Sequence, residues 1–281
     1  MLKGKTAVIT GGSRGIGKAI ARQLLNEGAA VLLVARSRAE LEATSKELAL
    51  LGCVEIMDAD VSHELDVIRI ADKISGLWNT ADILVNAAAI QGPIGPVTDV
   101  VNAAEWRLVI EINLFGTFLM IRALAPLMRI NGRGKIINFA GGGEGAYPNF
   151  SAYVASKGGI VRLTETVAAE LKADRIDVNA IAPGGVNTRM LDDVLEAGPA
   201  KAGREAYERS LKQKEAGGVP PEKAARLAAF LASEASDGLT GKVISAVWDD
   251  YGKFPQHLSE IVGSDVYSWR RIKPQDRGCE W

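Results

Sequence analysis

Short, continuously apolar segments alternate along the chain with longer segments of helical pattern. The short segments are rich in β-branched residues and do not alternate between apolar and polar positions. This predicts strands covered by helices on both faces of a parallel sheet. The predicted strands are 6–10, 30–34, 54–59, 83–86, 135–139, 177–181 and 242–246. The predicted helices are 16–27, 38–51, 64–76, 103–130, 152–173 and 221–233.

This order of strands and helices predicts the fold class. Strand–helix–strand units favour an α/β fold, a single doubly wound parallel sheet of Rossmann type with helices on both faces. A chain of 281 residues can form such a sheet as one domain, 1–281, and no internal repeat or low-complexity linker divides it. Residues 185–220 are richer in charge and glycine and have no strand pattern, so we expect a mobile substrate-loop region there.

Composition narrows the classes of function. Hydrophobic residues make up 47% and charged residues 24% of the chain, which is typical of a soluble globular protein. The formal net charge is −1 and no basic stripe stands out, so nucleic acid is not an expected partner.

Neither a metal site nor a membrane segment is expected. Cys53 and Cys279 belong to no CxxC pair, and His63 and His257 are far apart in the sequence. The N-terminus lacks the apolar region of a secretion signal, and no apolar run approaches the ~20 residues of a membrane-spanning helix. We therefore expect a cytoplasmic protein with reduced thiols.

A glycine-rich turn follows the first predicted strand. That strand leads directly into Gly11-Gly12-Ser13-Arg14-Gly15-Ile16-Gly17, where a helix begins. The spacing is GxxxGxG rather than GxGxxG, but Gly11 still permits a tight turn, while Gly15 and Gly17 let backbone N–H groups approach a pyrophosphate. A glycine cluster alone is weak evidence, but its place between strand and helix makes it a strong prediction of a dinucleotide site.

The end of the second strand predicts which dinucleotide binds. An acidic residue there usually holds the ribose 2′-hydroxyl, but this strand ends Ala35-Arg36-Ser37. Arg36 and Arg14 could hold a 2′-phosphate by charge-assisted hydrogen bonds, whereas two solvated surface arginines are the plainer interpretation. Their position, where the adenosine ribose should lie, favours NADP(H) as the cofactor.

The segment Tyr153-Val154-Ala155-Ser156-Lys157 places a phenol and an ammonium on one face of a helix. A phenol with a pKa of ~10 transfers protons poorly near neutrality. An adjacent lysine favours the phenolate, so we expect Lys157 to lower the pKa of Tyr153. A packed tyrosine beside a lysine is the alternative, because this spacing is common by chance.

Taken together, these motifs resemble the short-chain dehydrogenase/reductase family from about residue 3 to residue 247. The matching elements occur in the family's order along the chain: the glycine turn, Asp60-Val61, Asn86-Ala87-Ala88-Ala89, Asn113, Tyr153-x-x-x-Lys157, Asn179 and Pro183-Gly184. The resemblance implies an enzyme that moves hydride between NADP(H) and a carbonyl or secondary alcohol, and a homodimer or homotetramer that pairs through helices 103–130 and 152–173.

The resemblance also implies roles for individual residues. Asp60 would bind the adenine edge, and Asn86 would lie by the adenosine ribose and support the central strand. Tyr153 would be the general acid/base, and Lys157 would hold the nicotinamide ribose hydroxyls. Asn113 would kink its helix and position a water. The remaining cofactor contacts implied are Val61, Ala87, Pro183, Gly184 and Thr188.

Two departures from the family pattern matter. Ala89 replaces a glycine, which we interpret as a mild packing change. The family's catalytic serine is missing: counting back from Tyr153 gives Ala140, and aligning the fifth strand gives Gly141. Losing one such donor typically costs ~10²–10³ in rate.

Several replacements for that serine are open. The backbone amides of 141–143 could stand in, as could the hydroxyl of Ser151 or Tyr147 or a group of the substrate; otherwise catalysis is feeble. The alternative function is therefore a catalytically weak NADP(H)-binding regulatory or scaffold protein of the same fold. Keto-acyl compounds, sugars or nucleotide sugars, polyols and small ketones are all open as substrates.

The C-terminal extension, 248–281, is rich in aromatic residues. Such side chains seek burial, so we expect the extension to pack on the parent domain or at a subunit contact rather than to bind substrate directly. The aromatic residues are Trp248, Tyr251, Phe254, Tyr267, Trp269 and Trp281.

Overall fold

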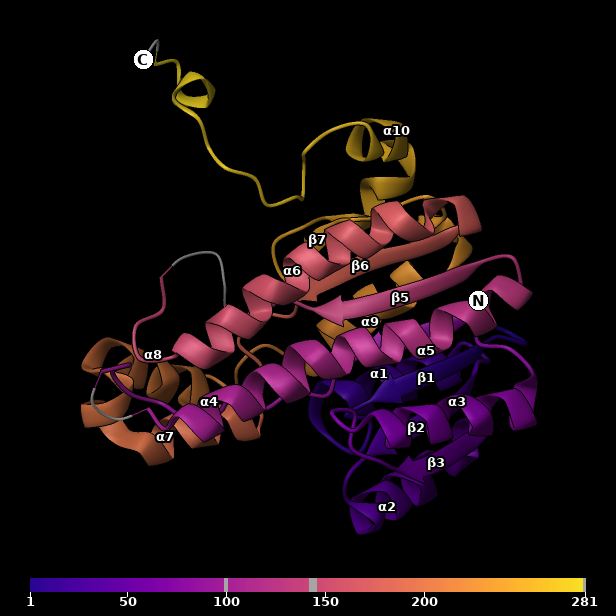
Figure 1. The fold of residues 1–281 in the computed structure, drawn as a ribbon, viewed down its shortest axis with the longest axis horizontal. Coiled ribbons are helices and arrows are strands. Elements are labelled where there is room, and N and C mark those ends of the chain that lie inside the picture. The colour runs from indigo at the N-terminus through magenta and orange to yellow at the C-terminus, as the bar shows by residue number, and fades with distance from the viewer. Residues whose placement is uncertain (99–100, 142–145, 280–281) are drawn as a thin grey trace.

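The computed structural model describes residues 1–98, 101–141 and 146–279. A seven-stranded parallel sheet with the order β3-β2-β1-β4-β5-β6-β7 lies at its centre (Figure 1). The strands are β1 (Thr6–Thr10), β2 (Ala30–Ala35), β3 (Val54–Asp58), β4 (Ile83–Asn86), β5 (Gly134–Phe139), β6 (Ile176–Ala182) and β7 (Val243–Ser245). The predicted α/β doubly wound fold is confirmed.

Helices connect the strands and cover the sheet. The α-helices are α1 (Gly15–Asn26), α2 (Arg38–Leu48), α3 (Glu64–Trp78), α4 (Ala103–Ile110), α5 (Gly116–Ile130), α6 (Ser151–Leu171), α7 (Arg189–Ala202), α8 (Arg204–Glu215), α9 (Pro221–Ala232) and α10 (Leu258–Val262). The short 3₁₀ segments are η1 (Ala49–Leu51), η3 (Lys172–Asp174), η4 (Glu234–Ser236), η5 (Tyr251–Gln256) and η6 (Pro274–Arg277). The helix predicted at 103–130 is divided by a π-helical turn, η2 (Glu111–Phe115), between α4 and α5.

Both faces of the sheet are buried, which explains the continuously apolar strands. Val8 and Leu32 belong to a core shared with α3, α5 and α6, which lie in front of the sheet in Figure 1. Their neighbours Ile9 and Leu33 point to the opposite face and pack with α1, α2 and α9. Because successive side chains of a strand point to opposite faces, two covered faces require apolar residues at every position.

The order in which the strands are connected indicates at which edge of the sheet a ligand would bind. The chain runs from β1 outward to β3 and then returns to pair β4 with the other side of β1. Thr10 and Asn86, the last residues of β1 and β4, are register partners at this reversal. In open α/β sheets, ligands bind in the crevice at the carboxyl ends of such diverging strands.

The region 185–220, expected to be a mobile substrate-loop region, contains regular structure. It holds α7 and α8, beside the carboxyl ends of the strands (Figure 1). Ion pairs four residues apart stabilise these helices, for example Arg189 with Asp193 at 3.0 Å. Gly198 has a φ of 72° and interrupts α7. The charges that suggested a loop are therefore the polar faces of two helices.

The expectation about membrane-spanning segments is wrong for the helical run 103–130. By length and apolar composition it could span a membrane, contrary to the expectation that no segment approaches that length. More than half of its 18-residue apolar window is buried, and Leu119, Leu124 and Met128 belong to the core of the sheet. Its apolar character is accounted for by its place against the sheet.

The C-terminal extension packs on the parent domain as far as Trp269, whose amide donates to Glu165 of α6 at 3.0 Å. Phe254 and Ile261 are buried in the core that α1 and α9 share. The Tyr267 carbonyl accepts a hydrogen bond from the Val243 amide of β7 at 2.7 Å. Trp248 is 84% exposed, so burial of the aromatic residues is incomplete. Residues 270–279 extend away from the domain (Figure 1), and Trp281 lies outside the described residues.

Candidate active site

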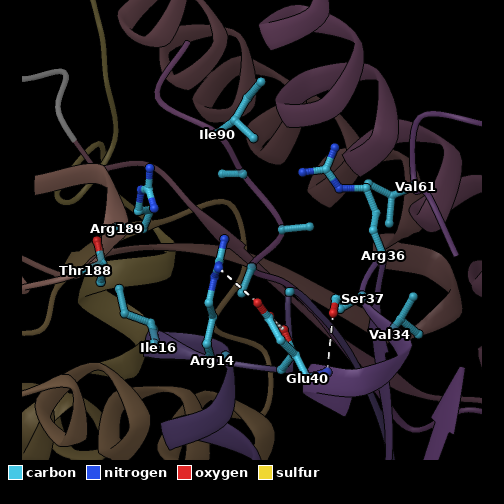
Figure 2. A pocket seen from close by; sticks show the side chains of 18 of the residues that line it. Arg14, Ile16, Val34, Arg36, Ser37, Glu40, Val61, Ile90, Thr188 and Arg189 are labelled. Atoms are coloured by element: carbon cyan, nitrogen blue, oxygen red, sulfur yellow. Dashed lines mark hydrogen bonds and ion pairs between the residues drawn. The ribbon is translucent and has the colours of Figure 1, made fainter. Parts of the chain in front are cut away.

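A cleft of about 480 Å³ opens where the chain reverses between β1 and β4 (Figure 2). It collects loops from the carboxyl ends of β1, β2, β3, β4 and β6. Predicted cofactor residues that line it are Gly11, Ser13, Arg14, Gly15, Ile16, Gly17, Arg36, Asp60, Val61, Ala87 and Thr188. Predicted residues outside this lining are Asn86, Asn113, Tyr153, Lys157, Pro183 and Gly184.

The glycine turn makes a cradle that side chains would fill. Gly11 has a φ of 65°, and a Cβ there would lie 2.9 Å from the Ala87 carbonyl oxygen. A Cβ on Gly17 would lie 2.3 Å from the Gly11 carbonyl oxygen, so Gly17 lets α1 pack against the turn. Arg14 precedes α1 without a side-chain cap, which leaves the first amides of the helix to bind an anion. The cradle fits a pyrophosphate.

The two arginines expected at the adenosine ribose differ in their surroundings. The Arg14 guanidinium pairs with Glu40 at 3.2 Å (Figure 2). Glu40 also accepts a hydrogen bond from the Ser13 hydroxyl at 2.9 Å. Arg36 lines the same cleft with an exposed side chain, and among the described residues it has no ion-pair partner. Arg36 is therefore the cation more readily available to a ligand.

Asp60 follows β3 at the far wall of the cleft. Its Oδ1 accepts hydrogen bonds from the Ser62 amide at 2.9 Å and from the Ser62 hydroxyl at 2.6 Å. Burial raises the pKa of Asp60, but the two Ser62 hydrogen bonds, His63 and Arg36 outweigh it, so the net pKa is lowered. The carboxylate is charged near neutrality and can accept a hydrogen bond from a ligand.

Asn86 lies beneath the cleft rather than in its lining. Its Nδ2 donates to Asn138 Oδ1 at 2.9 Å, which ties β4 to β5 and fits the expected support of the central strand. The Asn86 Oδ1 is buried and has no hydrogen-bond partner among the described residues. A buried acceptor without a partner is costly and marks a place where a ligand or water would be stabilised.

Tyr153 and Lys157 lie one turn apart on α6. The Lys157 Nζ is 5.5 Å from the centroid of the Tyr153 ring and donates to the Phe139 carbonyl, at the end of β5, at 3.0 Å. The Lys157 side chain is buried and the Tyr153 residue is half-buried. Among the described residues the Tyr153 hydroxyl has no hydrogen-bond partner, so it is available to a substrate.

The pKa of Tyr153 differs from the expectation that Lys157 lowers it. Burial, with a further contribution from the Tyr147 phenol, raises the pKa of Tyr153 to about 12. Burial also lowers the pKa of Lys157 to about 8. The lysine donates to a backbone carbonyl, and loss of solvent dominates both groups. Near neutrality Tyr153 therefore holds its proton and Lys157 is mostly charged.

Asn113 is fully buried in the π-helical turn, as expected for a residue that distorts its helix. Its Oδ1 accepts a hydrogen bond from the Ile90 amide at 2.9 Å, and its Nδ2 donates to the Ile90 carbonyl at 3.0 Å. Ile90 lines the cleft. The Asn113 Nδ2 also donates to Ser156 at 3.1 Å, which fixes α6 beside the cleft. The role in positioning a water stays a prediction.

The structure distinguishes the two candidate positions for the missing serine. The Ala140 side chain is buried with Val161 and Ala180, away from the cleft. A Cβ on Gly141 would lie 3.2 Å from Cδ of Pro183, the residue that follows β6. Gly141 is therefore the position that faces the Pro183-Gly184 loop. Residues 142 and 143, which could supply backbone amides, lie outside the described residues.

Several cleft residues were not foreseen from the sequence. They are Val34, Ser37, Glu40, Ala59, Ala88, Ala89, Ile90, Ile112, Asn187, Arg189 and Met190. Glu40 had a recognisable signal, because Ser37 and Glu40 form the S-x-x-E pattern of a helix start, and the Ser37 hydroxyl does accept a hydrogen bond from the Glu40 amide at 3.3 Å. Among residues 1–98, 101–141 and 146–279, no cluster of His, Cys, Asp and Glu could hold a metal ion.

Replacing Lys157 by Met should change how stability depends on pH. Below pH 8 the folded protein carries the full cost of a buried ammonium, and a pKa lowered from 10.5 to about 8 corresponds to about 3 kcal/mol. Between pH 8 and 10.5 the folded state loses this proton while the unfolded chain keeps it, so the parent gains stability as pH rises.

Urea unfolding from pH 7 to 10.5 measures this effect. The difference in free energy of unfolding, Lys157→Met minus parent, should fall by about 3 kcal/mol over that range. Lys46→Met, at an exposed lysine of α2, is the control and should show a constant difference. If the difference in free energy of unfolding for Lys157→Met is also independent of pH, burial does not lower the pKa of Lys157 as proposed.

Comparisons with known sequences agree with this site. A family model described as enoyl-(acyl carrier protein) reductase matches residues 11–247. An uncharacterized oxidoreductase of Bacillus subtilis is 36% identical over 87% of this chain and 90% of its own length. A 3-oxoacyl-[acyl-carrier-protein] reductase of Thermotoga maritima is 33% identical over 86% of this chain and 96% of its own.

Solved structures share the fold. Levodione reductase superimposes with a TM-score of 0.80 at 31% identity, covering 90% of this chain and 98% of its own. NAD⁺-bound xylitol dehydrogenase gives 0.79 at 28% identity, with coverages of 87% and 98%. A variant actinorhodin polyketide ketoreductase with NADPH gives 0.78 at 30% identity, with coverages of 86% and 95%.

Proposed function

The chain belongs to the short-chain dehydrogenase/reductase family of oxidoreductases, and from that premise we propose that it is an NADP(H)-dependent enzyme acting on a carbonyl/secondary-alcohol pair. The observation that carries the choice of NADP(H) is Arg36. Arg36 lines the cleft directly after Ala35, the last residue of β2. An acidic residue at the end of this strand would favour a cofactor with a free 2′-hydroxyl, and none is present here. A cytoplasmic location stays a prediction.

The Glu40 carboxylate disfavours a 2′-phosphate, because it is negatively charged and pairs with Arg14. This ion pair is exposed to solvent and therefore weak. The side chains of Arg14 and Glu40 are 65% and 43% exposed. An exposed ion pair contributes only about 0–1 kcal/mol, so Arg14 can leave Glu40 for a phosphate at little cost. A phosphate offers both arginines charge-assisted hydrogen bonds, which supports NADP(H) over NAD(H).

The arrangement around Tyr153 supports proton transfer to a carbonyl oxygen. When bound, the nicotinamide dinucleotide supplies the hydride. Tyr153 is protonated near neutrality and gives its proton to the substrate oxygen as general acid. The charged Lys157, 5.5 Å from the ring, stabilises the phenolate that remains and is the residue proposed to hold ribose hydroxyls. Thr188, Pro183 and Gly184 would face the nicotinamide end.

A substrate panel tests this proposal. The names of the relatives indicate oxo-acyl, xylitol and levodione chemistry. We would measure NADPH oxidation with levodione, acetoacetate and an acetoacetyl thioester, and NADP⁺ reduction with xylitol and sorbitol. Turnover with at least one compound is expected. A protein that binds NADPH but turns over none of these compounds would instead favour the regulatory or scaffold alternative, which the absence of a hydroxyl at Gly141 supports.

We also propose that the protein forms a homodimer through α4, η2 and α5. Leu108, Phe115 and Phe118 are 42%, 44% and 38% exposed, and the two phenylalanine rings stack at 5.8 Å. On α6, by contrast, the apolar stripe expected to pair subunits is mostly core. Its members are Ile160, Leu163, Val167, Ala168 and Leu171.

Charging the exposed phenylalanines should separate the subunits. The double variant Phe115→Glu, Phe118→Glu should be monomeric by light scattering at micromolar concentration, because two carboxylates cannot be buried against an apolar face. Leu50→Glu is the matched control, since Leu50 is a 97% exposed apolar residue of η1. A parent that is itself monomeric would contradict the proposal.

A further inference from the structure

We propose that Tyr147 is a catalytic residue that donates a hydrogen bond to the substrate carbonyl oxygen, in the place of the hydroxyl that Gly141 lacks. The inference rests on the proposed function and deepens it. A carbonyl oxygen gains negative charge during reduction, and a second donor besides the general acid stabilises that charge. Gly141 has no side chain to provide one, and Ala140 points into the core.

The turn before α6 fixes the Tyr147 ring. The Phe150 amide donates to the Tyr147 carbonyl at 3.4 Å, and the two rings stack with centroids 4.2 Å apart and planes 9° apart. Phe150 is only 1% exposed, so it anchors the stack. Tyr153 lies in the first turn of the helix that follows, so the anchor that orients Tyr147 also begins the helix that carries the general acid.

Tyr147 forms part of the wall between α6 and the α7–α8 region. It packs in a cluster with Ile94 of the loop after β4, Val154 of α6 and Val194 of α7. Val154 follows Tyr153 on α6, and the Tyr147 phenol is close enough to Tyr153 to contribute to its raised pKa. The Arg209 guanidinium of α8 lies over the Tyr147 ring, 5.6 Å from its centroid, and makes a cation–π contact with it.

The Tyr147 hydroxyl suits a neutral donor. Among the described residues it has no hydrogen-bond partner, so it can turn to a ligand. Burial raises the pKa of Tyr147, although the nearby Arg209 opposes this, so the phenol keeps its proton near neutrality. The contribution of Tyr147 to the raised pKa of Tyr153 is in keeping with their proximity. One phenol can then transfer its proton while the other only donates a hydrogen bond.

The other hydroxyls near α6 already have structural partners. Ser151 accepts a hydrogen bond from the Trp106 indole at 3.2 Å. Ser156 is fully buried, donates to the Tyr153 carbonyl at 2.7 Å and accepts from Asn113 at 3.1 Å. Tyr147 is therefore the candidate among these three whose hydroxyl is not used by the fold.

The test is Tyr147→Phe, which keeps the stack on Phe150 and the ring beneath Arg209. With the panel compound that the parent turns over fastest, kcat should fall by about 10²–10³-fold. The NADPH dissociation constant, measured by fluorescence, should stay within twofold because Tyr147 is proposed to contact the substrate oxygen and not the cofactor. Tyr207→Phe, at a second tyrosine of the same cluster, should leave kcat within twofold.

A rescue experiment separates a lost donor from a disturbed fold. In the Tyr147→Phe background, Gly141→Ser should recover at least tenfold in kcat, whereas Gly141→Ala, with the same Cβ and no hydroxyl, should recover none. Kcat of Tyr147→Phe within threefold of the parent would overturn the inference and favour backbone donors, while leaving the proposed function intact. The inference would also be overturned if Tyr147→Phe lowers kcat and the added Gly141→Ser does not restore it. A parent inert on the whole panel would overturn both proposals.

Discussion

Replacing Tyr153 by Phe should lower turnover by about 10²–10⁴-fold while NADPH still binds, because the ring remains and only the transferable proton is lost. The Tyr153 hydroxyl has no structural hydrogen bond among the described residues, so its removal should not unfold α6. Steady-state kinetics with an accepted carbonyl compound, together with NADPH binding, measures the two effects separately. Turnover near the parental rate would disprove the proton-transfer role.

The pH dependence provides a second measurement of the same role. Burial raises the pKa of Tyr153 to about 12 and lowers that of Lys157 to about 8. In carbonyl reduction the phenol must be protonated and the lysine charged, so kcat should be level below pH 8 and fall above it. Lys157→Ala should reduce both turnover and NADPH binding, since Lys157 is proposed to serve both, and its residual activity should lose the fall near pH 8.

Replacing Arg36 by Asp should reverse the cofactor preference from NADPH to NADH. A charge-assisted hydrogen bond contributes about 1.5–3 kcal/mol, so loss of this contact alone should weaken NADPH about 10- to 100-fold. The new carboxylate also repels a 2′-phosphate and can accept a hydrogen bond from a 2′-hydroxyl. Binding constants for both cofactors, measured at one ionic strength, give the preference directly.

Arg38→Asp is the matched control for this change in charge. Arg38 lies two residues further on, outside the cleft, and pairs with Glu42 at 2.8 Å and Asp58 at 3.2 Å. Its replacement should leave the preference for NADPH in place. Equal affinities of the parent for the two cofactors would contradict the proposed role of Arg36. Glu40→Gln should strengthen NADPH binding, because it frees Arg14 and removes a negative charge from the cleft.

The secondary structure was predictable because it depends on neighbours close in sequence. All seven strands form within about one residue of their expected bounds, since a continuous apolar run fits a strand buried on both faces. The exceptions are informative. The π-helical turn at Asn113 interrupts a pattern that is helical throughout, and α7 and α8 have charged faces that resembled a loop.

The sequence by itself determined the sheet, the glycine turn and the positions of Arg36, Tyr153 and Lys157, because strand runs, turns and helical spacing are local properties. The tertiary structure decided what surrounds them. It brings Glu40 to Arg14 and points Ala140 into the core, and burial raises the pKa of Tyr153. Ion pairs and burial depend on segments that come together only in the folded protein. The sequence pattern around a residue therefore does not determine whether its side chain is available to a ligand.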